Sequence, residues 1–384
     1  GRPAPPLGCG MNGCRSHDDA ASLACLAGLP GISPGPLASL LSHHSVHEAV
    51  AVARGDQPAR GPIAEYLAKR QKMRTNWPAA VRERPPEWYR EALEHSSTTV
   101  LRPGDLGYPP QLVDDPRRPP VLFARGDLTC LASRRVGVVG TRNCTHQGRV
   151  VARRLGRELA EAGVVVVSGL ALGIDGASHE GALSAEGGRP AAVVGSGPDT
   201  PYPKRHSALW DAVIERGVLV SEWPPGTQPE AYRFPLRNRI LAALSEVLVV
   251  VESRERGGSL ITAREAGDRG VGVFAVPGSL NSPASVGAIQ LIRDGANIFT
   301  EAAYVYNALD LDHSRPGSRS IDTRQLPRGA EPRALEECRS APHTLELAAL
   351  VLGLGVGEAA MALARLERIG WLREVGGWYE PADE

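Results

Sequence analysis

The sequence is poor in lysine, has no excess of either charge and contains no long apolar run. Only three of its 43 basic residues are lysines, which leaves 40 arginines, and the acidic residues also number 43. A chain without net charge lacks the strongly basic character of many nucleic-acid-binding proteins, although it can still carry a local basic groove. The longest strand-like run, 247–251, is far shorter than the ~18 to 20 residues that span a bilayer. No membrane segment is therefore predicted.

Cysteine is also scarce, with six residues in a chain of 384. That number predicts no disulfide framework and favours reduced, unconnected thiols. Cys9 and Cys14 are spaced loosely like metal ligands, but no second Cys or His pair follows at a suitable distance, so no metal site is predicted. Residues 1–16 have no periodic pattern and are predicted to be a disordered tail or a remnant of expression. No secretion signal is visible, and we expect a cytoplasmic protein.

Residues 17–75 are predicted to form a small helical domain of the SAM or helix-hairpin-helix type. Apolar residues recur there at helical spacing, and the stretch 29–35 (LPGISPG) is a sharp turn between two helical patterns. In a helix-hairpin-helix such a turn directs backbone N–H groups toward a phosphate. An ordinary turn within a helical bundle explains the stretch equally well.

Residues 76–311 are interpreted as a connector followed by an α/β domain. The part up to 133 is rich in proline, and continuous apolar runs then alternate with helical patterns. This alternation predicts a Rossmann-like, doubly wound, mostly parallel sheet covered on both faces. The strand-like runs lie at 134–140, 163–168, 190–195, 217–222, 246–252 and 271–276, with a weaker one near 297–300.

The C-terminal part of the chain divides into a linker and a last small domain. Residues 312–333 have no apolar period and are predicted to be the linker. Residues 334–384 contain helical patterns followed by 371–379, which is predicted to be two short strands around a Gly-Gly turn. Two helices and a hairpin are typical of a winged helix. Five arginines against ten acidic residues over 330–384 make it a poor candidate for duplex binding.

Ligands of an open parallel sheet bind beyond the carboxyl ends of its strands, so the loops at that edge are the candidate site. The loop 140–148 opens a helix, whose free N–H groups attract an anion, and Arg142 adds a cation. The segment 234–240 (FPLRNRI) combines an aromatic ring with arginines, as single-stranded nucleic acid requires, although a core Phe with solvated arginines is an equal alternative. The predicted phosphate- or strand-binding residues are Gly140, Thr141, Arg142, Ser168, Gly169, Lys204, Phe234, Arg237, Asn238, Arg239, Gly258, Ser259 and Thr262.

Signatures of catalysis and of nucleotide cofactors do not appear beside these loops. The first loop is not GxGxxG, the second strand ends in Ser168-Gly169 instead of an acid, and no GxxxxGK[ST] or GxSxG is present. Asp175 and His179 form a conceivable acid/base pair, but helix capping and a structural histidine account for both. We therefore predict a binding groove, no cofactor and no enzyme.

The order of motifs resembles that of the DprA (Smf) family of bacterial DNA-processing proteins. The matching segments are 103–109, 137–143, 166–175, Tyr202-Pro203, 221–226, 234–240, 257–263, 275–278 and 285–296. This resemblance implies a non-catalytic protein that binds and protects incoming single-stranded DNA, loads RecA onto it during natural transformation, and forms a homodimer through its Rossmann-like domain. By position, Arg142 would contact phosphate, Phe234 a base, and Arg237, Asn238 and Arg239 the groove. Family members often have a basic residue where Leu172 stands.

The sequence leaves two other functions open. Phosphoribohydrolases of the cytokinin-activating type have a similar core with a PGGxGTxxE motif, which Gly257, Gly258, Thr262 and Glu265 resemble in part. The spacing between the glycine pair and the threonine is one residue too long, and no proline precedes the pair. Alternatively, the protein is chiefly an adaptor that acts through its acidic C-terminal domain.

Overall fold

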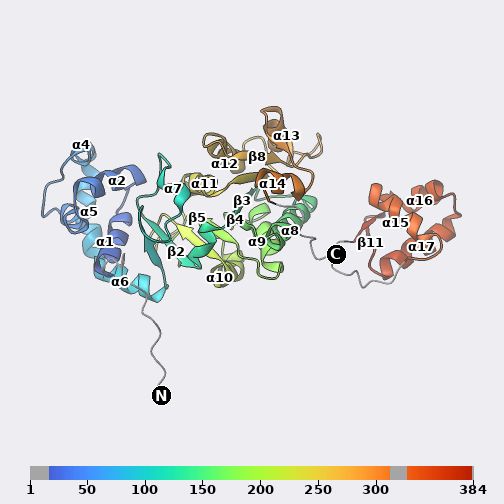
Figure 1. Ribbon diagram of the computed structural model, residues 1–384, viewed down its shortest axis with the longest axis horizontal. Coiled ribbons are helices and arrows are strands. Elements are labelled where there is room, and N and C mark those ends of the chain that lie inside the picture. Colours follow the sequence, from blue (N-terminus) through green and yellow to red (C-terminus); the bar gives the residue numbers. More distant parts are fainter. Residues whose placement is uncertain (1–16, 312–326, 383–384) are drawn as a thin grey trace, which may run out of the picture. The chain divides into compact units, whose positions relative to one another are not determined.

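The computed structural model describes residues 17–311 and 327–382 (Figure 1). The chain divides into two compact units between residues 317 and 318. The predicted tail 1–16 and most of the predicted linker, 312–326, lie outside the described residues.

The first unit begins with a bundle of helices around a core that includes Leu26, Leu40 and Trp77. The boundary expected at residue 75 is wrong, because it falls inside a helix whose Trp77 and Val81 are buried in this core. Prolines at the start of the next helix and within this one made the segment look connective. The helices of the bundle are α1 (His17–Ala27), α2 (Pro34–His43), α3 (Val46–Arg54), α4 (Pro62–Ala68), α5 (Gln71–Glu83) and α6 (Pro86–His95).

Two strands that the sequence pattern did not predict follow the bundle. β1 (Thr99–Leu101) and β2 (Leu122–Gly126) pair with each other in antiparallel fashion, and α7 (Pro110–Val113) lies between them in the chain. β2 also pairs antiparallel with a strand of the main sheet. Phe123 belongs to the core of the helical bundle and Leu122 to the core of the sheet. The expected connector therefore joins the two cores.

The main sheet has nine strands in the order β1-β2-β6-β5-β4-β3-β7-β8-β9. From β6 to β9 every neighbouring pair is parallel. The prediction of a Rossmann-like, mostly parallel sheet is confirmed, and each predicted strand-like run contains a strand. Those strands are β3 (Arg135–Val139), β4 (Val165–Ser168), β5 (Ala191–Val194), β6 (Val218–Ser221), β7 (Val247–Val250), β8 (Gly272–Ala275) and β9 (Asn297–Ile298).

Alternate residues of the central strands enter cores on opposite faces of the sheet. Val165 and Val167 pack against α11 (Arg233–Leu244) and α12 (Gly258–Gly267), whereas Val166 packs against α8 (His146–Glu161) and α9 (Ile174–Ser184). This is why the strands are apolar throughout instead of alternating with polar residues. The other helices of the domain are η1 (Leu128–Ala132), η2 (Lys204–His206), α10 (Ser207–Arg216), α13 (Val286–Arg293) and α14 (Ala302–Ala308).

The direction of winding reverses at β3. The chain passes from β3 through β4, β5 and β6 on one side, and then returns to β7 on the other side of β3. The loops that leave β3 and β7 therefore diverge, which opens a crevice at the carboxyl ends of these two strands.

The second unit is a small domain of helices and a three-stranded sheet in the order β10-β12-β11. Its core contains Leu363, Leu366 and Leu372. Its elements are α15 (Glu331–Ser340), β10 (His343–Thr344), α16 (Leu345–Leu352), α17 (Val356–Arg368), β11 (Leu372–Val375) and β12 (Trp378–Pro381). The predicted hairpin is present, since β11 and β12 pair around Gly376-Gly377. The winged-helix assignment stays a prediction.

Among the described residues no single helix is long and apolar enough to cross a membrane. Only α16 and α17 taken together meet the length and composition required, and they are bent by 111° relative to each other.

Candidate functional site

A cleft of about 560 Å³ opens at the reversal of the sheet, where β3 and β7 end. We call it the switch-point cleft. Its walls come from the loop after β3, the loop after β7, the first two turns of α11 and the start of α12. The residues that line it are Val139, Gly140, Thr141, Arg142, Ala171, Asp175, Tyr202, Pro229, Ala231, Phe234, Pro235, Arg237, Asn238, Leu241, Arg254, Arg256, Gly257, Gly258, Ser259 and Thr262.

The loop after β3 is held close to the end of β7. Thr141 donates its backbone N–H to the carbonyl oxygen of Glu252 at 2.8 Å. A side chain at Gly140 does not fit there, because its Cβ would lie 2.5 Å from Ile174 and 2.8 Å from the same carbonyl. This packing presents Arg142 at the mouth of the cleft, where its side chain is exposed.

The start of α8 already contacts a carboxylate of the protein itself, which differs from the prediction of a free anion site there. The Thr145 N–H donates to Glu252 Oε2 at 2.9 Å, and the Thr145 hydroxyl donates to Glu252 Oε1 at 2.5 Å. The Gly148 N–H is capped by the Thr145 hydroxyl at 2.9 Å. Glu252 thus occupies the positive end of the helix dipole. Binding of an external anion at this edge must depend mainly on side-chain cations.

An aromatic and cationic cluster forms one wall of the cleft. The Arg142 guanidinium lies over the Phe234 ring, 4.9 Å from its centroid. The Tyr202 ring lies against Phe234 with centroids 5.3 Å apart and planes tilted by 32°. Tyr202 is 39% exposed and Phe234 is half-buried, so ring surface remains open to a ligand. The sequence paired Phe234 with Arg142 in one groove, and the structure brings them into contact.

Arg237 lies in the inner wall as a buried cation. It donates to the carbonyl oxygens of Gly169, at 2.9 Å, and of Val193, and its Nη2 is 3.9 Å from Asp175 Oδ2. Burial lowers the pKa of Arg237 to about 10, so it stays charged at neutral pH. Burial also raises the pKa of Asp175, and the charge of Arg237 partly offsets that rise. Gly169 is required because a Cβ there would collide with the guanidinium.

Arg239 differs from the prediction, since it lies outside the cleft. Residues 234, 237, 238 and 241 of α11 share the face that lines the cleft, while residue 239 is rotated by roughly 200° from residue 237. Its buried guanidinium pairs with Glu222 and donates to the Arg117 carbonyl at 2.6 Å. Arg239 is therefore a structural arginine of the opposite face of α11.

The remaining predicted residues divide into two groups. Asn238, Gly258, Ser259 and Thr262 line the cleft, and the Asn238 amide ties α11 to α12 through the Gly258 carbonyl at 3.3 Å. Ser168 and Lys204 do not line it. The Ser168 hydroxyl is buried and donates to the Val138 carbonyl at 2.6 Å, and Lys204 is exposed on η2.

The sequence interpretation missed two cleft arginines. Arg254 and Arg256 follow β7 and are exposed in the lining. Their position in the sequence is a usable signal, because the loop after a central parallel strand borders the ligand crevice. We call Arg142, Arg254 and Arg256 the rim arginines. In the described parts of the chain none of them forms an ion pair. With Arg237 they give the lining four cations, against the single carboxyl of Asp175.

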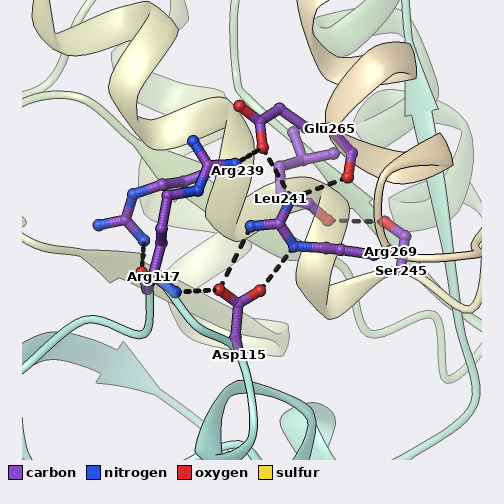
Figure 2. Close-up of polar contacts among 7 residues, drawn as sticks. All are labelled: Asp115, Arg117, Arg239, Leu241, Ser245, Glu265 and Arg269. Atoms are coloured by element: carbon purple, nitrogen blue, oxygen red, sulfur yellow. Dashed lines mark hydrogen bonds and ion pairs between the residues drawn. The ribbon is translucent and has the colours of Figure 1, made fainter.

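Glu265, the carboxylate that a phosphoribohydrolase would require, lies away from the cleft. Figure 2 shows it between Arg117 and Arg269, with Asp115 on the other side of Arg269. Burial raises the pKa of Glu265, but hydrogen bonds from Arg117 and Arg269 outweigh it and hold the pKa below its usual value. This group joins α12 to the segment before β2. Within residues 17–311 and 327–382 no cluster of His, Cys, Asp and Glu is arranged to hold a metal ion.

Fold and cleft together define a Rossmann-like protein with a crevice of net positive charge at the reversal of a doubly wound sheet. A model of the family described as DNA recombination-mediator protein A matches residues 99–310, more than half of the chain, and the chain belongs to this family. The family resemblance predicted from the motifs is confirmed.

Individual relatives agree with this assignment. The DNA processing protein DprA of Bacillus subtilis is 45% identical over 192 residues, which are 50% of this chain and 64% of that protein. The structure of DprA from Streptococcus pneumoniae aligns with a TM-score of 0.63 and 30% identity over 76% of this chain and 98% of that one. DprA from Helicobacter pylori, whose structure was described for its single-stranded DNA binding mode, aligns with a TM-score of 0.50 and 28% identity over 56% and 97% of the two chains.

Proposed function

We propose that the protein binds single-stranded DNA in the switch-point cleft, without catalysis and without a cofactor. The observation that carries the proposal is the contact between Arg142 and Phe234 at the mouth of the cleft. A cation beside a partly open ring offers a phosphate contact and a stacking surface within one nucleotide of each other. The other two rim arginines extend the positive charge along the opposite wall.

Single strands are favoured over duplexes because the aromatic surface lies in a recess. The rings of Phe234 and Tyr202 can stack on a base only if that base is free of its neighbours. A duplex presents phosphates on its outside and keeps its base faces covered. The likeness to the Helicobacter pylori protein, whose described property is single-stranded DNA binding, supports the same choice.

The cleft can be tested by the binding of oligo(dT) in fluorescence anisotropy over a series of salt concentrations. Arg142→Ala should weaken binding and lower the salt slope by about 0.7, the value for one phosphate contact on a single strand. Phe234→Ala should remove base stacking and weaken binding about tenfold or more, with the salt slope retained. A duplex of equal length should bind more weakly than the single strand.

Arg154→Ala is a matched control, because Arg154 is an exposed arginine of α8 that pairs with Glu158 at 3.4 Å and does not line the cleft. It should leave affinity and salt slope unchanged. If Arg142→Ala and Phe234→Ala both behave like this control, the DNA does not bind in the switch-point cleft.

The finer activities are also proposals: protection of incoming DNA, loading of RecA during transformation, and a homodimer formed through the Rossmann-like domain. The description of the family as recombination mediators supports loading. A strand-exchange assay with RecA and a single-strand-binding competitor should depend on the protein, and Arg142→Ala should reduce the effect. Sedimentation analysis with residues 330–384 deleted should still give a dimer if the Rossmann-like domain forms it.

For the second unit we propose a role in protein contact. Its surface exposes Leu350, Met361 and Trp378, while the acidic excess over 330–384 opposes binding to DNA. Deletion of 330–384 should leave affinity for single-stranded DNA unchanged. A large loss of affinity would mean that this unit contacts DNA.

A further inference from the structure

Aromatic side chains continue along the edge of the sheet beyond the switch-point cleft. The segment 222–232 leaves the carboxyl end of β6, which lies at the same edge as the ends of β3 and β7 because these strands are parallel. Near its end the segment borders the cleft, since Pro229 and Ala231 line it. The segment also contains the half-buried Trp223 and ends with Tyr232, which is 54% exposed. These two rings have no role in the cleft itself.

Arg233 holds the two rings in position. Its guanidinium carbon lies 5.3 Å from the centroid of the Tyr232 ring and 5.8 Å from that of the Trp223 ring. The Arg233 side chain is only 13% exposed, pairs with Glu230 at 2.8 Å and donates to the Gln228 carbonyl. Arg233 is therefore a positioning residue. The surface that remains for a ligand is that of the rings.

The same segment also contacts the helical bundle. Gly226 lies so close to α6 that a Cβ there would be 2.8 Å from Trp88 Cη2 and 3.5 Å from Arg84 Nη1. The Arg84 guanidinium carbon lies 4.9 Å from the centroid of the Trp88 ring. Trp88 is half-buried, whereas Arg84 is exposed and forms no ion pair among the described residues. The bundle thus repeats the arrangement of Arg142 and Phe234 in the cleft.

The surface between cleft and bundle offers aromatic rings more than positive charge. Glu83 and Glu87 flank Arg84 in the sequence and are exposed, so this end of the bundle has little net charge. Asp199 also lies here, where its carboxylate accepts the Gly226 N–H at 2.9 Å. A duplex, which presents its phosphates and covers its base faces, gains little from such a surface. Unpaired bases stack on exposed rings whatever their sequence.

We propose that the DNA strand bound in the switch-point cleft continues along this edge of the sheet onto the helical bundle. Its bases stack on Tyr232, Trp223 and Trp88, and Arg84 contacts a phosphate. We call these four residues the aromatic track. The inference rests on the proposed function, because the strand enters the track from the cleft. It gives the helical domain a part in DNA binding and makes the site longer than the cleft.

The steps along the aromatic track are short enough for one strand. Tyr232 is two positions before Phe234, at most about 7 Å along the chain, and residues 223 and 226 are three positions apart, at most about 11 Å. Tyr232 and Trp223 also border the same shallow hollow beside the start of α11. A strand therefore meets a ring every few nucleotides between the cleft and the bundle.

The test uses the full-length protein and oligo(dT) of two lengths, about six and about sixteen nucleotides, which lie near the limits of known single-strand site sizes. Only the longer strand reaches from the cleft to the bundle. Trp88→Ala should weaken binding of the longer strand about tenfold, the contribution of one stacked base, and leave the shorter strand unaffected. Tyr232→Ala should also weaken the longer strand about tenfold. Arg84→Ala should lower the salt slope of the longer strand by about 0.7.

Tyr304→Ala is the matched control, because Tyr304 on α14 is 49% exposed and lies outside both the cleft lining and the track. It should leave the affinity for both lengths unchanged. Trp88 packs edge-on against the buried Tyr89 ring, with centroids 4.8 Å apart, so its removal can disturb the bundle. A measurement on the wild type avoids this difficulty. A 5-iododeoxyuridine placed in turn at each end of the longer strand should crosslink on irradiation to Trp88 from one of the two ends.

The outcomes separate this proposal from the one on which it rests. If Trp88→Ala and Tyr232→Ala bind the longer strand like the Tyr304→Ala control, or if no crosslink to Trp88 forms, the track is overturned. The cleft stands in that case if Phe234→Ala still weakens both lengths. If Phe234→Ala and Arg142→Ala change neither length, the cleft assignment has failed, and the track fails with it. Equal weakening of both lengths by Trp88→Ala would mean that short strands bind on the bundle, which also overturns a path that begins in the cleft.

Discussion

The two sides of α11 face arginines of opposite character, some of them on the helix and some on neighbouring loops. On the cleft side the rim arginines are exposed and lack ion-pair partners within the described residues, whereas Arg237 lies beneath them in contact with Asp175. On the far side Arg239 is buried against Glu222. The same residue type is thus free for a ligand where water reaches it, and it stabilises the fold through a buried ion pair where water does not.

The energetic consequence follows from solvation. An exposed charge is already stabilised by water, so its removal changes stability little. Removing one member of a buried pair leaves the other charge uncompensated in a poorly solvated site. Substitutions of buried arginines should therefore affect folding, and substitutions of rim arginines should affect binding.

The largest effect is expected for Arg237→Met. It leaves Asp175 buried without its cation and removes the donors to the Gly169 and Val193 carbonyls. We expect a loss of about 3–5 kcal/mol in the free energy of unfolding of the first unit. Urea denaturation of the wild type and the variant measures this difference in the free energy of unfolding. A loss below about 1 kcal/mol would remove the distinction between the two classes of arginine.

Arg239→Met should come next, with a loss of about 3 kcal/mol, because it leaves the buried Glu222 carboxylate without its partner. The double variant Arg239→Met with Glu222→Leu should recover most of that loss, since both charges are then gone. Urea denaturation of the single variants and the double variant forms a complete cycle. Additive losses would show that the two side chains do not act as a pair.

Acid should destabilise the buried region through His179. Burial, together with the nearby charge of Arg237, lowers its pKa from 6.5 to about 3, although a hydrogen bond with the Ala191 carbonyl opposes the shift. The unfolded chain therefore binds a proton that the folded chain rejects, so stability is complete above pH 6.5 and falls as the pH drops toward 3. The expected slope is about 1.4 kcal/mol per pH unit. His179→Gln should flatten this slope in urea titrations at several pH values, and an unchanged slope would contradict this origin.

Arg254→Ala and Arg256→Ala should each leave the free energy of unfolding within about 0.5 kcal/mol of the wild type. Each should lower the salt slope of oligo(dT) binding by about 0.7 if it contacts a phosphate. Anisotropy titrations over several salt concentrations give both affinity and slope. Large destabilisation with unchanged binding would reverse the roles assigned to the two classes.

A small effect, on stability alone, is expected for Arg117→Ala. This side chain is largely exposed, and its pairing with Glu265 is worth less than about 1 kcal/mol. Its backbone carbonyl still accepts from Arg239, as Figure 2 shows. Thermal unfolding should shift by only a few degrees, and a larger shift would mean that the surface network stabilises the domain more than its exposure suggests.

The fold was largely predictable because buried parallel strands are continuously apolar. The runs that became β3 to β8 could be recognised without tertiary information. β1 and β2 could not, because they are short, lie in a proline-rich segment and gain their stability by pairing with the edge of an existing sheet. The domain boundary predicted at residue 75 is wrong for a related reason, since prolines within and before helices interrupt the apolar period.

The candidate site was predictable where residues follow one another on a helical face or at a strand end. Phe234, Arg237 and Asn238 satisfy the first condition, and Arg142 the second. Arg239 differs from the prediction because two positions along a helix point in nearly opposite directions, so its closeness to Arg237 in the sequence does not place it in the cleft. The hydrogen bonds between the Glu252 carboxylate and Thr145 at the start of α8 could not be predicted, because the two residues are 107 positions apart.

The sequence alone determined the alternation of strands and helices, the family, and the edge of the sheet where the chemistry lies, because all three depend on local pattern and on residue order. Only the tertiary structure decided which arginines are exposed and which are buried in pairs. Burial and pairing arise from contacts between segments distant in the chain, and the free energy of a charge depends on whether those contacts or water surround it.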